Sequence, residues 1–192
     1  MKKIKLKELE RKVKNCKRCP LFKERIKNKY FVVFGEGNVE AKIMFVGEAP
    51  GRNEDLQGKP FVGAAGKFLN ELLDFIGLRR EEIFITNILK CRPPGNRNPK
   101  SNEIKACTPY LDKQIELIKP KIICTLGNFA TSYIMKKFGL EPKSMGKIHG
   151  KIFKIKNLTQ ELKIIPLYHP AAAIYNPNMK KILLEDFKKI KE

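Results

Sequence analysis

Residues 42–51, which read Lys-Ile-Met-Phe-Val-Gly-Glu-Ala-Pro-Gly, decide the fold class of this chain. The apolar run 43–46 is too short for a buried helix and ends at a glycine, which is typical of a strand buried on both faces. Three similar apolar runs follow at 83–86, 121–126 and 164–168. Segments with a helical spacing of apolar residues separate them. This alternation predicts a three-layer α/β/α domain with a mainly parallel, four-stranded central sheet.

The remaining expected elements are five helices and a hairpin. The expected helices are 5–14, 67–76, 102–118, 128–138 and 178–190. Residues 152–155 alternate in polarity, so we expect them to pair with 163–167 as a hairpin. Because no long linker or internal repeat interrupts the sequence, we expect one domain over 1–192, with residues 1–30 as a basic segment.

The charge of the chain indicates a class of partner. There are 40 Lys and Arg residues against 20 Asp and Glu residues, a net charge of +20, and residues 1–30 hold 13 of the basic side chains. Such a charge opposes folding through self-repulsion and favours a polyanion, so nucleic acid is the leading partner class. A lysine-rich composition of the thermophilic kind is the alternative. The sequence has no run of 18 apolar residues and no secretory signal, which predicts a cytoplasmic protein without a membrane partner.

Five cysteines give the sharpest chemical signal. An odd number without a secretion signal disfavours a disulfide framework. Cys16 and Cys19 form a Cys-x-x-Cys turn, and Cys91 and Cys107 are separated by 15 residues. Four soft ligands suit zinc or an iron–sulfur cluster. Cys124 lies inside an expected strand and is interpreted as a core residue. The alternative is that all five are core or incidental thiols.

Several polar side chains follow the expected strands. Ligands of open α/β sheets bind outside the carboxyl ends of the strands, so these residues belong together. Glu48 and Glu54 follow the first strand, Phe61 lies in the loop after them, Asn87 follows the second strand and His169 follows the last. Each alone has a structural alternative: a capping Asn87, a core Phe61 or a hydrogen-bonding His169. Their convergence at one edge predicts a ligand site.

Two nucleotide-binding motifs are excluded. Gly63 to Lys67 looks like part of a phosphate loop, but Phe61 and Phe68 stand where a Walker A motif needs Gly and Ser or Thr. No Gly-x-Gly-x-x-Gly motif follows the first strand. The site is therefore not predicted to bind a nucleotide cofactor.

Four segments carry a resemblance to a known family. They are Gly-Glu-Ala-Pro-Gly-x-x-Glu-Asp at 47–55, Gly-Lys-Pro-Phe-Val-Gly-x-Ala-Gly at 58–66, Thr-Asn-Ile-Leu-Lys-Cys-Arg-Pro-Pro at 86–94 and His-Pro-Ala at 169–171. In this order, with the four cysteines, they resemble the family 4 uracil-DNA glycosylases, the iron–sulfur type of bacteria and archaea. The resemblance covers nearly the whole chain. It implies a structural [4Fe–4S] cluster on four ligands, namely Cys16, Cys19, Cys91 and Cys107, which would anchor the basic segment 1–30.

The resemblance also implies roles for the pocket residues, and their chemistry agrees with those roles. A base inside a duplex must be flipped out to be reached. Phe61 would stack on the flipped uracil, and Asn87 would read its Watson–Crick edge. His169 would donate a hydrogen bond to O2, where negative charge develops as the glycosidic bond breaks.

Water activation is less well defined by the resemblance. Ala49 is expected to line the substrate pocket at the position where the best known uracil-DNA glycosylases carry a water-activating Asp. Alanine cannot activate water, and family 4 members commonly have a small residue there. Glu48 and Glu54 are therefore the candidate catalytic carboxylates. The alternative is that either one caps a turn or binds a backbone amide.

Three loops are expected to contact DNA. They are the cationic loop 93–99, the glycine-containing loop 143–150, and the turn 170–177, which in the wider superfamily enters the minor groove. The candidate DNA-binding residues are Arg97, Lys143, Lys147, Ile174 and Tyr175. The alternative for the last two is that they pack under the terminal helix.

The function implied is DNA repair. We expect a monomeric enzyme that hydrolyses the N-glycosidic bond of uracil in single- or double-stranded DNA, releasing free uracil and leaving an abasic site without lyase activity. A sliding clamp is a candidate partner. Two other classes are weighed: a non-enzymatic, metal-containing nucleic-acid-binding protein, and a redox carrier. The combination of Phe61, Asn87 and His169 disfavours both.

Overall fold

The computed structural model describes residues 1–156 and 161–191. Within them, one sheet has the strand order β1-β3-β2-β4-β6-β5. The strands are β1 (Glu36–Gly37), β2 (Ile43–Gly47), β3 (Phe84–Asn87), β4 (Ile122–Leu126), β5 (Phe153–Lys156) and β6 (Glu161–Leu167). The predicted α/β class is therefore confirmed.

The predicted number of strands is wrong, because the described part of the sheet has six strands and is mixed. Strands β3, β2, β4 and β6 run parallel, and β1 and β5 add antiparallel edges. The two-residue strand β1 has no apolar run, so the sequence pattern does not indicate it. It pairs with β3 because residue 37 is a glycine: a Cβ on Gly37 would lie 1.9 Å from the carbonyl oxygen of Ile83. The expected hairpin is confirmed by the antiparallel pairing of β5 with β6.

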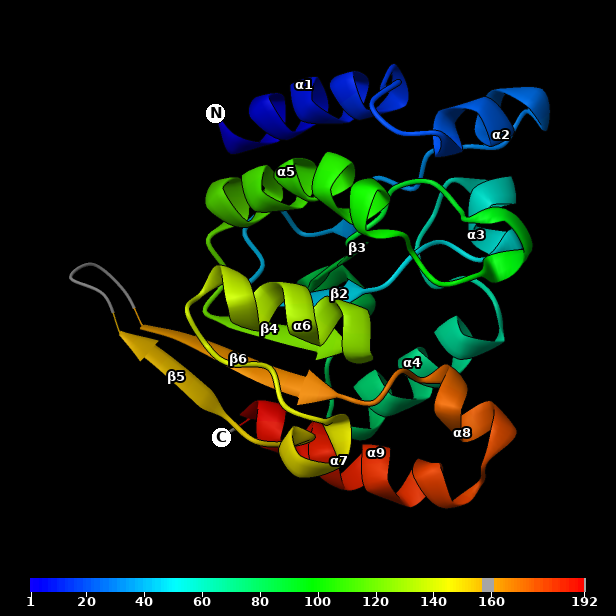
Figure 1. The fold of residues 1–192 in the computed structure, drawn as a ribbon. Coiled ribbons are helices and arrows are strands. Elements are labelled where there is room, and N and C mark those ends of the chain that lie inside the picture. The colour runs from blue at the N-terminus through cyan, green and yellow to red at the C-terminus, as the bar shows by residue number, and fades with distance from the viewer. Residues whose placement is uncertain (157–160, 192) are drawn as a thin grey trace.

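Helices cover both faces of the sheet (Figure 1). One face carries α5 (Ser101–Ile118) and α6 (Asn128–Lys137), with α1 (Lys2–Lys14) packed outside α5. The other face carries α4 (Ala64–Phe75) and α9 (Asn178–Lys188). Successive residues of a strand point to opposite faces. Accordingly, Met44 and Val46 join the core under α5 and α6, whereas Phe45 joins the core under α4 and α9.

The remaining elements are short. They are α2 (Leu21–Lys27), α3 (Arg52–Gln57), α7 (Met145–Ile148), α8 (Ala171–Tyr175) and the 3-10 turns η1 (Arg80–Glu82), η2 (Pro94–Asn96) and η3 (Lys189–Lys191). The expected helices start up to three residues later than the observed ones, because the first turns of α1 and α4 lack the apolar spacing on which the prediction depends. No helix in the described ranges is long and apolar enough to cross a membrane.

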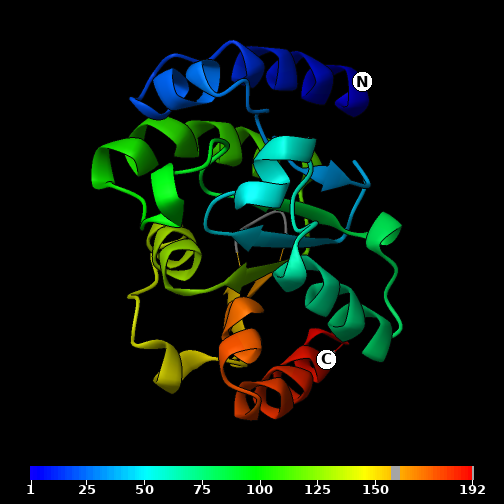
Figure 2. The same cartoon turned by 90° about the vertical axis from the view of Figure 1, so that its right-hand side faces the viewer.

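The parallel strands all end at one edge of the sheet. In Figure 1 the arrows of β4 and β6 point toward the side where α3 and α8 lie. Figure 2 views the molecule from that side, with α3 and α8 in the foreground. The topology thus gathers the loops that follow β2, β3 and β6 into one place, as the sequence predicts.

Candidate active site and cysteine centre

A cavity of about 360 Å³ opens at the carboxyl ends of the parallel strands. This is within the usual size of a small-molecule site. All of the predicted catalytic and substrate-binding residues line it: Glu48, Ala49, Glu54, Phe61, Asn87 and His169. The predicted convergence of these side chains is therefore confirmed.

Asn87 ends β3 and is 2% exposed, yet its Oδ1 has no hydrogen-bond partner among the described residues. Buried acceptors are normally paired, so an orphan that faces a cavity indicates a missing donor. Gly47 makes this arrangement possible, since a Cβ there would lie 2.4 Å from Asn87 Oδ1 and 2.8 Å from Phe61 Cζ. The glycine brings both side chains against the end of β2.

Phe61 lies in an unusual backbone conformation beside the histidine. Its φ is 51°, in the left-handed region that an aromatic residue rarely adopts. Its buried ring stacks on His169 with centroids 5.5 Å apart and an interplanar angle of 27°. Residues held in this region often belong to binding sites, because the surrounding structure must impose the strain.

His169 follows β6, and its hydrogen bonding defines its tautomer. Nδ1 accepts a hydrogen bond from the backbone N–H of Ala171 at 3.2 Å, so the neutral ring carries its proton on Nε2. Burial lowers the pKa of His169 to about 4, and the nearby Glu54 carboxylate only partly opposes this shift. At neutral pH the ring is therefore an uncharged donor at Nε2.

Four of the five cysteines line a second, smaller cavity, on the face that carries α1 and α5. They are Cys16, Cys19, Cys91 and Cys107. The backbone N–H of Lys90 donates to Cys107 Sγ at 3.2 Å, and Arg25 donates to the Cys16 carbonyl oxygen at 3.2 Å. Cys124 is fully buried in β4, away from this cavity, as expected of a core residue.

The electrostatics of this cysteine centre do not favour free thiolates. Burial raises the pKa of Cys91 to about 12 and that of Cys107 to about 11. Holding four thiolates here therefore requires additional positive charge. Within the described residues, no three His, Cys, Asp or Glu side chains converge closely enough to hold one metal ion. All four cysteines nevertheless line the same small cavity.

The comparisons with known proteins agree with this geometry. The sequence profile of the uracil DNA glycosylase superfamily matches residues 34–190. A type-4 uracil-DNA glycosylase from Sulfurisphaera tokodaii is 53% identical over 97% of this chain and 84% of its own length. Its counterpart from Saccharolobus solfataricus is 54% identical over 94% of this chain and 82% of its own, and that from Archaeoglobus fulgidus is 48% identical over 97% and 92%. The chain belongs to family 4 of the uracil-DNA glycosylases.

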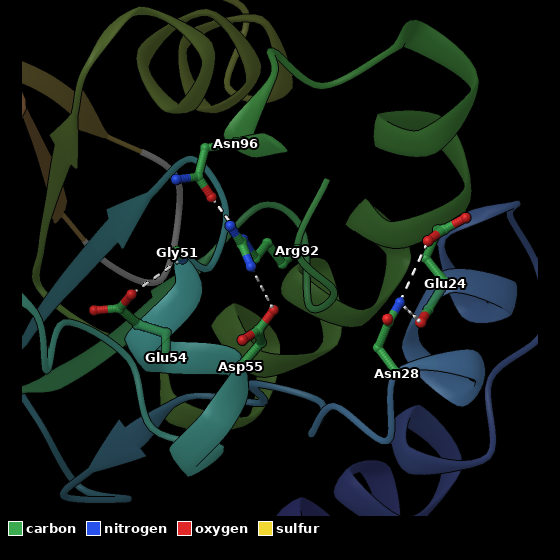
Figure 3. Close-up of polar contacts among 7 residues, drawn as sticks. All are labelled: Glu24, Asn28, Gly51, Glu54, Asp55, Arg92 and Asn96. Atoms are coloured by element: carbon green, nitrogen blue, oxygen red, sulfur yellow. Dashed lines mark hydrogen bonds and ion pairs between the residues drawn. The ribbon is translucent and has the colours of Figure 1, made fainter. Parts of the chain in front are cut away.

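The two candidate carboxylates of this family 4 glycosylase differ in their surroundings. Glu54 accepts a hydrogen bond from the backbone N–H of Gly51 at 3.1 Å (Figure 3). It also accepts hydrogen bonds from the backbone N–H groups of Val62 and Gly63 at 2.9 Å each. Its carboxylate thus holds the backbone of the loop 58–63. This is the alternative given in the sequence analysis, that Glu54 binds backbone amides. Glu48 makes no hydrogen bond through its side chain to the described residues, and burial raises its pKa. Of the two, Glu48 is the freer to contact a water molecule.

A brace beside the cavity was not predicted from the sequence. Arg92 Nη1 lies 3.4 Å from Oδ2 of the fully buried Asp55, and its Nε donates to Asn96 Oδ1 at 2.6 Å (Figure 3). The brace ties α3 to the loop 93–99 of the glycosylase. The sequence shows that Asp55 and Arg92 are oppositely charged, but no local pattern indicates that these two distant residues pair.

Lys90 is a second feature that sequence reasoning missed. Its fully buried ammonium donates to Thr86 Oγ1 at 2.5 Å, to the carbonyl oxygen of Asn87 at 2.8 Å and to Gln114 Oε1 at 2.7 Å. Burial lowers the pKa of Lys90 to about 7. This network fixes the end of β3, and with it Asn87, to α5.

The predicted DNA-contacting residues of the glycosylase have different environments. Arg97 forms a bidentate ion pair with the buried Glu103, with distances of 3.0 and 2.6 Å, so its guanidinium already has a partner. Lys143 and Lys147 are exposed. Ile174 and Tyr175 on α8 are 47% and 87% exposed, so the alternative that they pack under the terminal helix is wrong.

The buried neutral His169 leads to a prediction for stability. In the folded protein its pKa is about 4, below the ordinary value of 6.5. Between these values the unfolded chain binds a proton that the folded chain does not, so this residue costs stability as the pH falls below about 6.5 and nothing above it. As the pH falls from 6.5 toward 4, we expect the unfolding free energy of His169→Asn to decrease less steeply than that of the unmodified protein. The difference in slope should be up to about 1.4 kcal/mol per pH unit.

Urea unfolding of both proteins between pH 4 and 7.5 measures this difference. The buried carboxyl groups titrate in both proteins, so the comparison isolates the histidine. Equal pH dependence of the two proteins would mean that the folded protein accommodates the charged ring.

Proposed function

We propose that this chain is a uracil-DNA glycosylase enzyme, which hydrolyses the N-glycosidic bond of uracil in DNA and leaves an abasic site. The orphan Oδ1 of Asn87, in one cavity with Phe61 and His169, is the observation that carries the proposal. The relatives named above are all described as type-4 uracil-DNA glycosylases, which supports the same activity.

Recognition of the base follows from the carboxamide. Asn87 Oδ1 accepts from uracil N3–H, and its Nδ2 donates to O4. Cytosine presents the opposite pattern at both positions, so it leaves the buried groups unpaired. Phe61 stacks on the ring of the flipped base. The deep burial of Asn87 supports this discrimination, because an unpaired polar group is most costly where water cannot replace the partner.

Bond cleavage leaves negative charge on uracil O2. The neutral His169, with its proton on Nε2, donates a hydrogen bond there, and this bond strengthens as the charge develops. Glu48 orients the attacking water or stabilises the cationic sugar, while Glu54 holds the loop around the site through its three amide bonds. Hydrolysis without lyase activity stays a prediction from the sequence.

DNA is held outside this cavity. We propose that Lys143 and Lys147 bind phosphates and that Ile174 or Tyr175 fills the space left by the flipped base. The exposure of all four side chains supports these roles. Arg97 lines the cavity, and its proposed phosphate contact would be made while it stays paired with Glu103.

We also propose that the cysteine centre holds a structural [4Fe–4S] cluster on Cys16, Cys19, Cys91 and Cys107. Each thiolate of such a cluster binds a different iron, so the four sulfurs surround a volume and do not meet at a point as they do around zinc. That all four cysteines line one cavity supports this proposal. When bound, the iron supplies the positive charge that the buried thiolates need.

The alternative is a nucleic-acid-binding protein of the same family with a silent pocket. Incubation with uracil-containing single- and double-stranded DNA, followed by alkaline cleavage, separates the two. Strand cleavage at uracil supports the enzyme, and its absence in cluster-loaded protein would leave only binding. A monomeric state, a cytoplasmic location and a sliding-clamp partner stay predictions from the sequence.

Two substitutions separate chemistry from recognition. His169→Ala removes a donor that matters most in the transition state, so we expect the single-turnover rate to fall by roughly 10²–10³ with little change in DNA affinity. Asn87→Asp replaces the donor to O4 by an acceptor, so we expect poor activity on uracil and a relative gain on cytosine.

Rates are measured at saturating enzyme, and affinity is measured with DNA that carries an uncleavable uracil analogue. His169→Ala protein that loses DNA binding but keeps its rate at saturation would make the histidine a docking residue.

The metal proposal predicts about four irons per chain in protein purified without oxygen, with the broad visible absorption of an iron–sulfur cluster. Cys107→Ala should lose iron and colour. Cys124→Ala serves as the matched control, because this thiol is buried in β4 and should leave the iron content unchanged. Iron and zinc are counted by elemental analysis, and stoichiometric zinc without iron would contradict the assignment.

The DNA contacts predict a salt dependence. If Lys147 neutralises one phosphate, Lys147→Ala should reduce the slope of log affinity against log salt by about 0.9 for double-stranded DNA. Lys156→Ala, at the last residue of β5, is the control, since this exposed side chain does not line the groove of Lys147 and β5 points away from the side where α3 and α8 gather (Figure 1). Equal slopes for the unmodified protein and Lys147→Ala would place DNA on another surface.

A further inference from the structure

The backbone of Phe61 is held in a conformation that its own residue type disfavours. Its φ of 51° lies in the left-handed region, which is unfavourable for a residue with a Cβ. The ring is nevertheless buried and stacked on His169. Neighbouring groups must therefore fix this segment.

Arg80 is the side chain that binds the segment directly. It leaves η1, on the stretch of chain that leads into β3, and its guanidinium reaches back to the loop before α4. Nη2 donates to the carbonyl oxygen of Pro60, and Nη1 donates to that of Phe61 at 3.2 Å. Nη1 also donates to Asn70 Oδ1 on α4 at 3.1 Å. One planar cation thus holds two successive carbonyl groups and the adjoining helix.

The opposite side of the same peptide is closed by backbone. A Cβ at Gly66, in the first turn of α4, would lie 1.9 Å from the carbonyl oxygen of Phe61. That oxygen is therefore confined between the helix and the guanidinium. A carbonyl held from both sides cannot rotate, so the direction of the Phe61 side chain is set as well.

We infer that Arg80 is a positioning residue for the base-stacking ring of Phe61. The inference rests on the proposed function, because it assumes that this ring receives uracil. Arg80 does not line the cavity, so it acts through the backbone of Phe61 and not on the base itself. A guanidinium suits this task because its fixed fork of donors can bind two acceptors at once.

Arg79 provides a matched control within the same turn. Its side chain is 76% exposed, and its partner is Glu82 at 3.5 Å on the surface. Arg79→Ala and Arg80→Ala remove the same charge from adjacent positions. Any effect through the overall attraction to DNA is therefore common to both, whereas an effect through Phe61 belongs to Arg80 alone.

The experiment compares Arg80→Ala, Arg79→Ala, Phe61→Ala and the double variant Phe61→Ala/Arg80→Ala. We expect Arg80→Ala to lower the single-turnover rate on uracil-containing DNA by about 10-fold and to raise the inhibition constant of free uracil by a similar factor. Affinity for abasic DNA should stay unchanged. Arg79→Ala should match the unmodified enzyme in all three measurements.

The double variant distinguishes positioning from general stability. If Arg80 acts through the ring, removing it after Phe61→Ala should change the rate less than about 2-fold, because coupled residues are not additive. A further 10-fold loss in the double variant would overturn the inference. So would equal behaviour of Arg80→Ala and Arg79→Ala.

Arg80→Lys covers the case in which Arg80→Ala does not fold. A lysine keeps the charge but cannot bind both carbonyl groups as a fork, so it should give an intermediate rate and inhibition constant, and wild-type values would overturn the inference. No excision by the unmodified protein would overturn the proposed function instead. If the unmodified protein excises uracil and Arg80→Ala loses no more activity than Arg79→Ala, this inference alone is overturned.

Discussion

A buried ammonium group connects the two centres of this molecule. Lys90 lies between the cysteine centre and the active-site cavity, and its Nζ must find oxygen acceptors because an unpaired charge in the core is very costly. It binds Thr86, the carbonyl of Asn87 and Gln114. These acceptors belong to β3 and α5, so their positions are mutually fixed. The next residue in the chain is Cys91, which transmits the same constraint to the proposed cluster.

The active-site loops are held by side chains that bind backbone groups of other segments. Glu54 accepts hydrogen bonds from two backbone N–H groups of the loop 58–63 and from that of Gly51. Arg80 donates to two carbonyl groups of the same loop. A carboxylate thus binds N–H groups of this short loop, and a guanidinium binds its carbonyl groups. Phe61 is thus held through its own backbone carbonyl group, and its ring stays available for the proposed stacking on the base. Such support is what a site needs when its binding groups lie on loops.

The orphan acceptor of Asn87 and the neutral His169 are two consequences of one environment. Both lie where the parallel strands end, and Gly47 leaves room there for Asn87. Burial there makes an unpaired amide costly and a charged imidazole unfavourable. The same low polarity strengthens hydrogen bonds to a bound base and to the charge that develops on it. In the proposed mechanism, desolvation is therefore the shared source of base recognition and of the cleavage rate.

The sequence by itself determined the parallel core, the separation of Cys124 from the other cysteines and the residues that meet at the strand ends. Apolar periodicity and the ends of strands are local properties, and parallel strands bring their carboxyl ends to one edge. Only the tertiary structure decided that β1 extends the sheet, that Glu54 supports a loop, that Arg97 pairs with Glu103 and that Arg80 holds Phe61. These contacts depend on how loops close over one another. A side chain's partner is then set by distance in space, which residue type and local spacing do not encode.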